Sequence, residues 1–197
     1  MLTLDEGIIA TRFARSVVEG VVKNQKPQKI DLSSNFKKKL GVFVTLHNHP
    51  SHTLRGCIGI PLPIMTLENA IKEAGRSVTH DPRFLPLRKD ELDKIIVEIT
   101  ILTEPKVIDI DNPREYLKKI KIGRDGLIIS HLGRSGLLLP QVPVEQGWGE
   151  EEYLTNICLK AGLPPDAWFD KESKISSFTG QIFSELDPCG KIVENKI

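Results

Sequence analysis

Ile95-Ile96-Val97-Glu98-Ile99-Thr100-Ile101-Leu102 is the strongest strand signal in this chain of 197 residues. Isoleucine, valine and threonine dominate it, and β-branched residues favour strands because they pack well on a pleated surface. Side chains alternate between the faces of a strand, which separates Ile96, Glu98 and Thr100 from Ile95, Val97, Ile99 and Ile101. We therefore expect a sheet strand with one wholly apolar face.

A hairpin is predicted upstream of this strand. Val42-Phe43-Val44-Thr45-Leu46 has the β-branched and aromatic composition of a strand, and a second extended run covers Thr53 to Ile60. The short loop from His47 to His52 joins them. Two strands joined by so short a loop pair in an antiparallel manner.

Two helices flank this hairpin in the sequence. The first is predicted from Leu4 into the region of Val21, because Thr3 and Glu6 have capping-box spacing and apolar residues follow at steps of four. The second begins after Thr66 and ends before Asp81-Pro82; its apolar stripe consists of Leu67, Ala70, Ile71, Ala74 and Val78.

The second half of the chain repeats the mixture of strands and helices. We expect a short helix around Pro113 to Lys118, followed by a hairpin whose strands cover 126–130 and 136–139. A helix over 150–161, closed by Gly162, and a last strand over 175–186 complete the chain. No regular βαβ alternation is present. The prediction is an α+β fold with mostly antiparallel sheets, as one domain over residues 1–197 with two lobes.

Composition excludes several classes of protein. The net charge is +1, with 27 Lys and Arg against 26 Asp and Glu, so nucleic acid is an unlikely partner. The N-terminus lacks a basic region followed by an apolar stretch, and no apolar run approaches the roughly 18 residues of a membrane span. We expect a cytoplasmic protein that does not enter a membrane.

Standard catalytic and cofactor motifs are absent. The chain has no GxGxxG, P-loop, HExxH, EF-hand loop or GxSxG sequence, so no cofactor is indicated. Its three cysteines, Cys57, Cys158 and Cys189, lie far apart without a CxxC pair, which argues against a disulfide scaffold or a zinc knuckle. The loop histidines His47, His49 and His52 lack the further ligands of a standard site, so no metal is expected there.

The most function-like segment is Leu54-Arg55-Gly56-Cys57-Ile58-Gly59, called the signature segment below. Glycine inside a strand costs about 0.5–1 kcal/mol relative to alanine, so two glycines need a reason. A bulge, or the close approach of a ligand or of another part of the chain, would supply one. Alternation places Arg55, Cys57 and Gly59 on one face of the strand and the apolar residues on the other.

Two interpretations of this segment remain open. A guanidinium two residues from a thiol favours the thiolate, which would make Cys57 a nucleophile activated by Arg55. Alternatively, Cys57 is a small buried hydrophobe and Arg55 a partner in a structural ion pair. The pKa and the exposure of the thiol decide between them.

Taken in order along the chain, several motifs resemble those of the AMMECR family, named after the human chromosomal region of Alport syndrome with intellectual disability, midface hypoplasia and elliptocytosis. The resemblance is to its archaeal and bacterial single-domain members, and it rests on the unbroken signature segment and on further segments in the same order: 81–84, 97–102, 139–142, Trp148 and 160–163. It covers nearly the whole chain. The chain departs from the family pattern in the loop from His47 to His52 and at His80.

The resemblance implies a two-lobed α+β fold with a cleft near the signature segment. It does not supply a reaction, but it strengthens the hypothesis of an enzyme or enzyme component that uses Cys57, activated by Arg55, on a small molecule or a modified macromolecule. The candidate substrate-binding residues are Gly56, Gly59, Asp81, Arg83, Glu98 and Gln141. Because relatives occur beside or fused to Memo-like and radical-SAM domains, the alternative is a non-catalytic interaction module that partners such a component.

Overall fold

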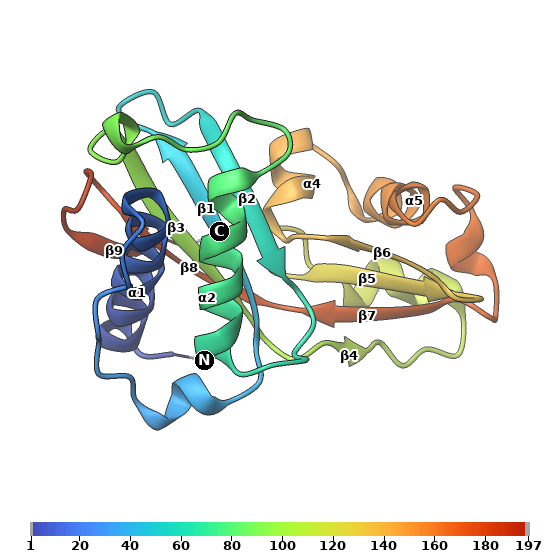
Figure 1. Cartoon of the computed structure of the whole chain (residues 1–197). Coiled ribbons are helices and arrows are strands. Elements are labelled where there is room, and N and C mark those ends of the chain that lie inside the picture. Colours follow the sequence, from blue (N-terminus) through green and yellow to red (C-terminus); the bar gives the residue numbers. More distant parts are fainter. Residues whose placement is uncertain (1, 196–197) are drawn as a thin grey trace. The chain divides into compact units, whose positions relative to one another are not determined.

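The structure, a computed structural model, describes residues 2–195 (Figure 1). The chain divides into two compact units, each with its own sheet. Residues 2–102 and 181–195 form the first unit, and Thr103–Gly180 form the second. The first unit is therefore built from both ends of the described chain.

The first unit contains a five-stranded sheet in the order β2-β1-β3-β8-β9. Its elements are α1 (Leu4–Lys23), η1 (Ser34–Lys37), β1 (Gly41–Asn48), β2 (Leu54–Ile60), α2 (Leu67–Ser77), η2 (Val78–His80), η3 (Lys89–Glu91), β3 (Ile95–Leu102), β8 (Gly180–Glu185) and β9 (Ile192–Asn195). The helices α1 and α2 contact each other and pack on one face of the sheet (Figure 1). The opposite face of β1, β2 and β3 carries the polar side chains described below.

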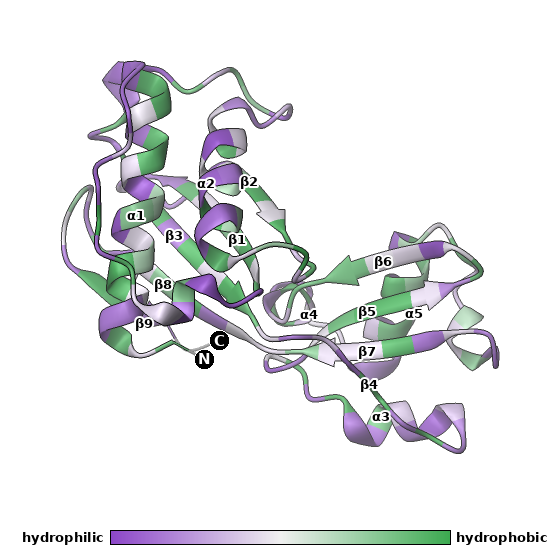
Figure 2. Cartoon of the chain, turned by 60° about the horizontal axis from the view of Figure 1, so that its bottom comes forward, coloured by the Kyte–Doolittle hydropathy of each residue, from purple (hydrophilic) through white to green (hydrophobic). Residues whose placement is uncertain are grey.

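Helix α1 begins as its sequence predicts. The hydroxyl of Thr3 accepts a hydrogen bond from the N–H of Glu6 at 3.2 Å, and the Glu6 carboxylate accepts the N–H of Thr3 at 3.0 Å. This reciprocal capping satisfies two of the N–H groups that a helix start leaves unpaired. Polar and apolar residues alternate around the helix in Figure 2, and its fully buried members Ala10, Ala14 and Val17 face the core.

The predicted hairpin and the strand β3 are neighbours in the first sheet, with β2 at its edge. Strand β1 is antiparallel to both β2 and β3, and Thr45 lies opposite Cys57 on one side and Glu98 on the other. Val42, Val44 and Leu46 alternate with these polar residues and are fully buried in the core. One face of the strands is thus apolar and the other polar, as the alternation of residues predicts.

The second unit contains a four-stranded sheet in the order β4-β7-β5-β6. Its elements are β4 (Lys106–Val107), η4 (Pro113–Glu115), α3 (Tyr116–Lys119), β5 (Gly126–His131), β6 (Arg134–Leu138), α4 (Gln141–Gln146), α5 (Glu150–Lys160), η5 (Ala167–Phe169) and β7 (Lys174–Phe178). Tyr153 anchors its core: the buried hydroxyl donates to the carbonyl oxygens of Asp125 and Leu138, both at 3.1 Å. Cys158 is fully buried in the same core.

The expected single strand from Ile175 to Leu186 is wrong. It is two strands in two different sheets: β7 pairs with β5, whereas β8 lies next to β3. Between them Thr179 pairs with Thr103, whose hydroxyl accepts the N–H of Thr179 at 2.9 Å. An extended sequence pattern does not specify its partners, so the change of sheet left no local signal.

The remaining elements support the predicted class. The hairpin of β5 and β6, the helix α5 and the α+β arrangement with mostly antiparallel sheets are confirmed, whereas α4 and β9 were not predicted. Nowhere between residues 2 and 195 does a helix combine the length and the apolar character that crossing a membrane requires.

Candidate functional site

Cys57 lies on β2, the edge strand of the first sheet. Its backbone N–H donates to Oδ2 of Asp81 at 2.9 Å, and its carbonyl oxygen accepts a hydrogen bond from Nη2 of Arg83 at 3.0 Å. Its Sγ accepts the hydroxyl of Thr45 at 3.3 Å. Two side chains thus take the place of a neighbouring strand at this edge, and they fix the position of the thiol.

The Asp81 carboxylate is the centre of this arrangement. It is buried, and it accepts hydrogen bonds from Arg83 through the backbone N–H at 3.1 Å, Nε at 3.0 Å and Nη2 at 2.7 Å. The hydrogen bonds from the Arg83 side chain, followed by that from the N–H of Cys57, hold the pKa of Asp81 well below its ordinary value. Asp81 therefore stays charged, and we call Asp81 and Arg83 the edge clamp.

A row of polar side chains crosses the sheet from Cys57. Thr45 is opposite Cys57, and Glu98 is opposite Thr45 on the far side. His47 is two residues along β1 from Thr45, and its Nε2 is 3.9 Å from Oε1 of Glu98. We call Cys57, Thr45, Glu98 and His47 the polar row; its Thr45 is buried, whereas the other three are half-buried.

The thiol of Cys57 is not activated by its surroundings. Burial raises its pKa most strongly; the hydrogen bond from Thr45 and the charge of Arg83 lower it, and the charges of Glu98 and Asp81 raise it further. The net direction is upward. The group is therefore a neutral thiol near pH 7, which needs a base before it reacts as a nucleophile.

Arg55 has a different role from the one expected. Its Nε donates to Oε1 of Glu91 at 2.8 Å, and Nη2 donates to Oε2 of Glu91 at 3.1 Å and to the carbonyl of Leu85 at 2.9 Å. The expectation that Arg55 lowers the pKa of Cys57 is wrong, because its guanidinium is committed to Glu91 and the effective cation is Arg83.

Beside Arg55 the surface is hollowed. A cavity of about 520 Å³ is lined by Arg55, Phe84, Leu85, Pro86, Arg88 and Glu91. Leu85 is 80% exposed at this cavity. Within the first unit, this cavity therefore adjoins the signature segment at Arg55.

The two glycines of the signature segment make room for the chain itself. A Cβ at Gly59 would lie 2.3 Å from the ring of Phe43, and a Cβ at Gly56 would lie 3.1 Å from the carbonyl oxygen of Val78. Of the reasons that the sequence left open, the structure therefore provides the close approach of another part of the chain. The expected contact of Gly56 and Gly59 with a substrate has no support in this geometry.

Gln141 is the expected site residue that the first unit does not contain. It is the first residue of α4 in the second unit, and its Oε1 is buried without a hydrogen-bond partner among residues 2–195. The first unit brings together Cys57, Asp81, Arg83 and Glu98. The group assembled there does not include Gln141.

Thr45 and the pairing of His47 with Glu98 were not found from the sequence. The available signal was a polar residue inside each of two strands, since Thr45 and Glu98 stand within runs of mostly apolar residues. The histidines expected in one loop diverge: His47 lies on β1 and faces Glu98, whereas Nε2 of His49 is 3.7 Å from Oδ1 of Asp187. Across the described part of the chain, no three His, Cys, Asp or Glu residues are grouped as a metal site would require.

Comparison with known proteins agrees with the motifs of the sequence. The family model AMMECR1 matches residues 11–183. Protein MJ0810 of Methanocaldococcus jannaschii is 52% identical over 198 residues, covering 100% of this chain and 98% of its own. Protein MK0488 of Methanopyrus kandleri is 47% identical over 199 residues, covering 100% of this chain and 96% of its own.

A solved structure shows the same fold. The crystal structure of the uncharacterized protein PH0010 from Pyrococcus horikoshii has a TM-score of 0.90 and 44% identity, and the match covers 100% of this chain and 99% of that one. Sequence and fold therefore agree over the whole length. The chain belongs to the AMMECR1 family.

Proposed function

We propose that this protein is an enzyme, or a component of one, that uses the thiol of Cys57 on a small molecule or a modified macromolecule. The observation that carries the proposal is the fixed position of Cys57. Three side chains from two separate segments, Thr45 on β1 and the edge clamp Asp81 and Arg83, form hydrogen bonds with its sulfur, its N–H and its carbonyl oxygen. Such fixation is typical of catalytic groups, which need a geometry held to a fraction of an ångström.

We take the base that a neutral thiol requires from the polar row, with the hydroxyl of Thr45, which lies between Cys57 and Glu98 in the sheet, relaying the proton. Glu98 and His47 lie on the same face of the sheet as Cys57, and both can accept a proton. Removal of the thiol proton after a substrate has bound would form the thiolate of Cys57 only for the reaction with that substrate. The pKa of Cys57, raised by burial, suits such a group because it suppresses reaction with adventitious electrophiles.

Arg55 supports this site as a positioning residue. Its pairing with Glu91 ties β2 to η3, and the intervening chain carries both members of the edge clamp. Asp81 and Arg83 then hold the backbone of Cys57. The free thiols of Cys57, Cys158 and Cys189 suit a reducing compartment such as the cytoplasm.

Alkylation of the intact protein tests the enzymatic proposal. Iodoacetamide labelling, followed by mass spectrometry of the peptides, should modify Cys57 at a rate that rises steeply with pH. The rate should be somewhat higher in Glu98→Gln, because the charge of Glu98 raises the pKa of the thiol. Cys57→Ser gives the background. If Cys57 is untouched in the folded protein from pH 7 to 10 but reacts normally after denaturation, the catalytic proposal fails.

The alternative function is an interaction module that partners a radical-SAM or Memo-like protein. The specific observation in its favour is the cavity beside Arg55, where exposed Leu85 and the neighbouring Phe84 and Pro86 give an apolar rim. Apolar side chains gathered on a surface commonly mark interfaces. Sedimentation of the protein with each candidate partner distinguishes the functions: loss of the complex in Leu85→Asp, and not in Cys57→Ser, would favour the module.

A further inference from the structure

A second cavity of the first unit lies far along the sequence from the signature segment. It has a volume of about 520 Å³ and is formed by α1, by the chain that follows it to Ile30, and by the turn and strand at 189–192. Small-molecule sites commonly have volumes of about 300–1,000 Å³. No residue of the polar row lines this cavity, which we call the α1 cavity.

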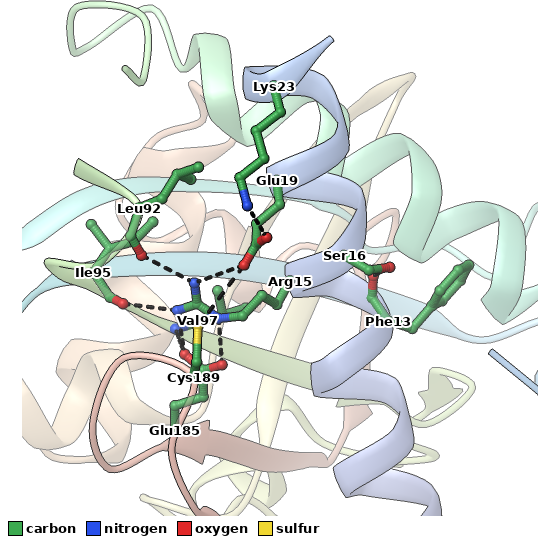
Figure 3. Close-up of polar contacts among 10 residues, drawn as sticks. All are labelled: Phe13, Arg15, Ser16, Glu19, Lys23, Leu92, Ile95, Val97, Glu185 and Cys189. Atoms are coloured by element: carbon green, nitrogen blue, oxygen red, sulfur yellow. Dashed lines mark hydrogen bonds and ion pairs between the residues drawn. The ribbon is translucent and has the colours of Figure 1, made fainter. Parts of the chain in front are cut away.

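The floor of the α1 cavity is a buried ion pair (Figure 3). Nε and Nη2 of Arg15 each donate to an oxygen of Glu185 at 2.5 Å, and Arg15 also donates to the carbonyl oxygens of Leu92 and Ile95. Oε2 of Glu185 accepts the N–H of Val97 at 2.9 Å as well. This network joins α1, β3 and β8 at the floor of the cavity.

The lining has an excess of positive charge. Four cationic side chains, Arg12, Arg15, Lys23 and Lys26, share the cavity with two anionic ones, Glu19 and Glu185, which leaves two positive charges uncompensated. Arg15 is held by Glu185, and Nζ of Lys23 is 2.5 Å from Oε2 of Glu19. Among residues 2–195, neither Arg12 nor Lys26 forms an ion pair with a carboxylate. A phosphate monoester carries about −1.5 to −2 at pH 7, which matches this excess.

Apolar side chains complete the lining. Ile9, Ile30 and Ile192 line the same cavity and also contact the hydrophobic core. On α1, Ile9 is one turn from Arg12 and almost four turns from Lys23, since a helix has about 3.6 residues per turn. The cavity wall is therefore apolar at Ile9, Ile30 and Ile192, and it is cationic at Arg12 and Lys23 on the helix and at Lys26 in the chain that follows it. A bare inorganic ion would leave the apolar wall unused.

We propose that the α1 cavity binds an organic phosphate monoester of about nucleotide size. The phosphate contacts Arg12 and Lys26, and the organic body contacts Ile9, Ile30 and Ile192. Cys189 also lines the cavity, and its Sγ donates to Oε1 of Glu19 at 3.9 Å. A bound ligand therefore covers this thiol, which gives a measurement independent of Cys57.

Calorimetry and Cys189 alkylation on the full chain test this proposal. The probes are ribose 5-phosphate, adenosine monophosphate, adenosine and inorganic phosphate, each at low ionic strength. We expect at least one of the two monoesters to bind and to slow the alkylation of Cys189 about tenfold at saturation, with adenosine and inorganic phosphate at least tenfold weaker. The double variant Arg12→Gln, Lys26→Gln should lose at least tenfold in affinity.

The matched control is Lys37→Gln, Lys38→Gln, which removes the same charge from exposed positions outside the cavity. It should bind like the wild type. The proposal is overturned if neither monoester binds at millimolar concentration, if inorganic phosphate binds as tightly as the esters, or if both double variants weaken binding equally. Protection of Cys57 in place of Cys189 would also overturn it. Failure of the monoesters to bind in the α1 cavity would leave the proposed role of Cys57 unaffected.

Discussion

The carboxylate of Asp81 accepts a hydrogen bond from the backbone N–H of Cys57 at 2.9 Å, across 24 residues of sequence. The edge strand β2 would otherwise present this N–H without a partner in the sheet. One ionised side chain therefore closes the sheet edge at the residue that the proposed function requires.

Removing the charge of Asp81 should destabilise the first unit. In Asp81→Asn, one carboxylate oxygen is replaced by an amide nitrogen, which donates and cannot accept. The N–H of Cys57 or the guanidinium of Arg83 therefore loses its hydrogen bond to a charged acceptor. Such bonds contribute about 1.5–3 kcal/mol each. Urea unfolding should show that the free energy of unfolding decreases by this amount. Asp90→Asn, which alters an exposed pair with Arg88, is the control and should leave the free energy of unfolding unchanged.

The three thiols should react with iodoacetamide at pH 7 in the order Cys189, Cys57, Cys158. Cys189 is exposed, Cys57 is half-buried and Cys158 is fully buried. Arg83→Gln should slow Cys57 further, because the charge of Arg83 lowers the pKa of this thiol. Arg55→Lys should lower the free energy of unfolding, because lysine cannot make both hydrogen bonds of Arg55 to Glu91. It should change the labelling rate of Cys57 little. A large effect of Arg55→Lys on the rate, with none for Arg83→Gln, would contradict this account.

Gly59→Ala should reveal the packing role of this glycine. The added Cβ would lie 2.3 Å from Cδ1 of Phe43, and overpacking of this kind costs about 1–3 kcal/mol. In a Phe43→Ala background the same substitution should cost much less, since the ring is gone. A double-mutant cycle measured by thermal unfolding gives the coupling. Equal costs in both backgrounds would show that Gly59 has another function.

Glu6 should contribute stability that disappears in acid. Its pKa is lowered from 4.5 to about 2, first by the hydrogen bond from Ser33 and then by the N–H of Thr3. A carboxyl with a lowered pKa in the folded state stabilises fully above its unfolded pKa, and the effect is lost as the pH falls from about 4.5 to about 2. Comparing the free energy of unfolding at pH 6 and pH 3 should show a smaller change in Glu6→Gln than in wild type. Asp5→Asn, exposed in the same turn, is the control.

The loop histidines should not retain a metal. The structure directs His47 and His49 toward different carboxylates, on Glu98 and Asp187. Elemental analysis of untagged protein should give less than one zinc, copper or nickel ion per ten chains. Stoichiometric metal that is lost in a His47→Ala, His49→Ala, His52→Ala variant would contradict the prediction.

Local signals in the sequence predicted the elements whose causes are local. Thr3 and Glu6 are three residues apart, so their capping box could be recognised directly, and alternation in β3 correctly placed Glu98 on the polar face. The hairpin of β1 and β2 followed from two strand patterns and a short loop. These features depend on neighbours in the sequence and need no knowledge of the remaining fold.

The unpredicted features depend on distant partners. Arg55 pairs with Glu91, 36 residues later, in a segment without strand or helix periodicity, so its commitment could not be inferred. The pKa of Cys57 follows mainly from burial, which the packed structure determines. The separation of β7 from β8 likewise depends on which strands each one meets.

The order in which the chain is made has a consequence for the first unit. A ribosome would complete the whole of Thr103–Gly180 before it releases β8 and β9, the strands that finish the first sheet. Until then, β3 has an open edge and Arg15 lacks Glu185. The second unit can therefore fold during translation, whereas the first unit, although its synthesis begins earlier, cannot complete its sheet until the end. A chaperone would be needed while the N-terminal half of the chain is made but its sheet is incomplete.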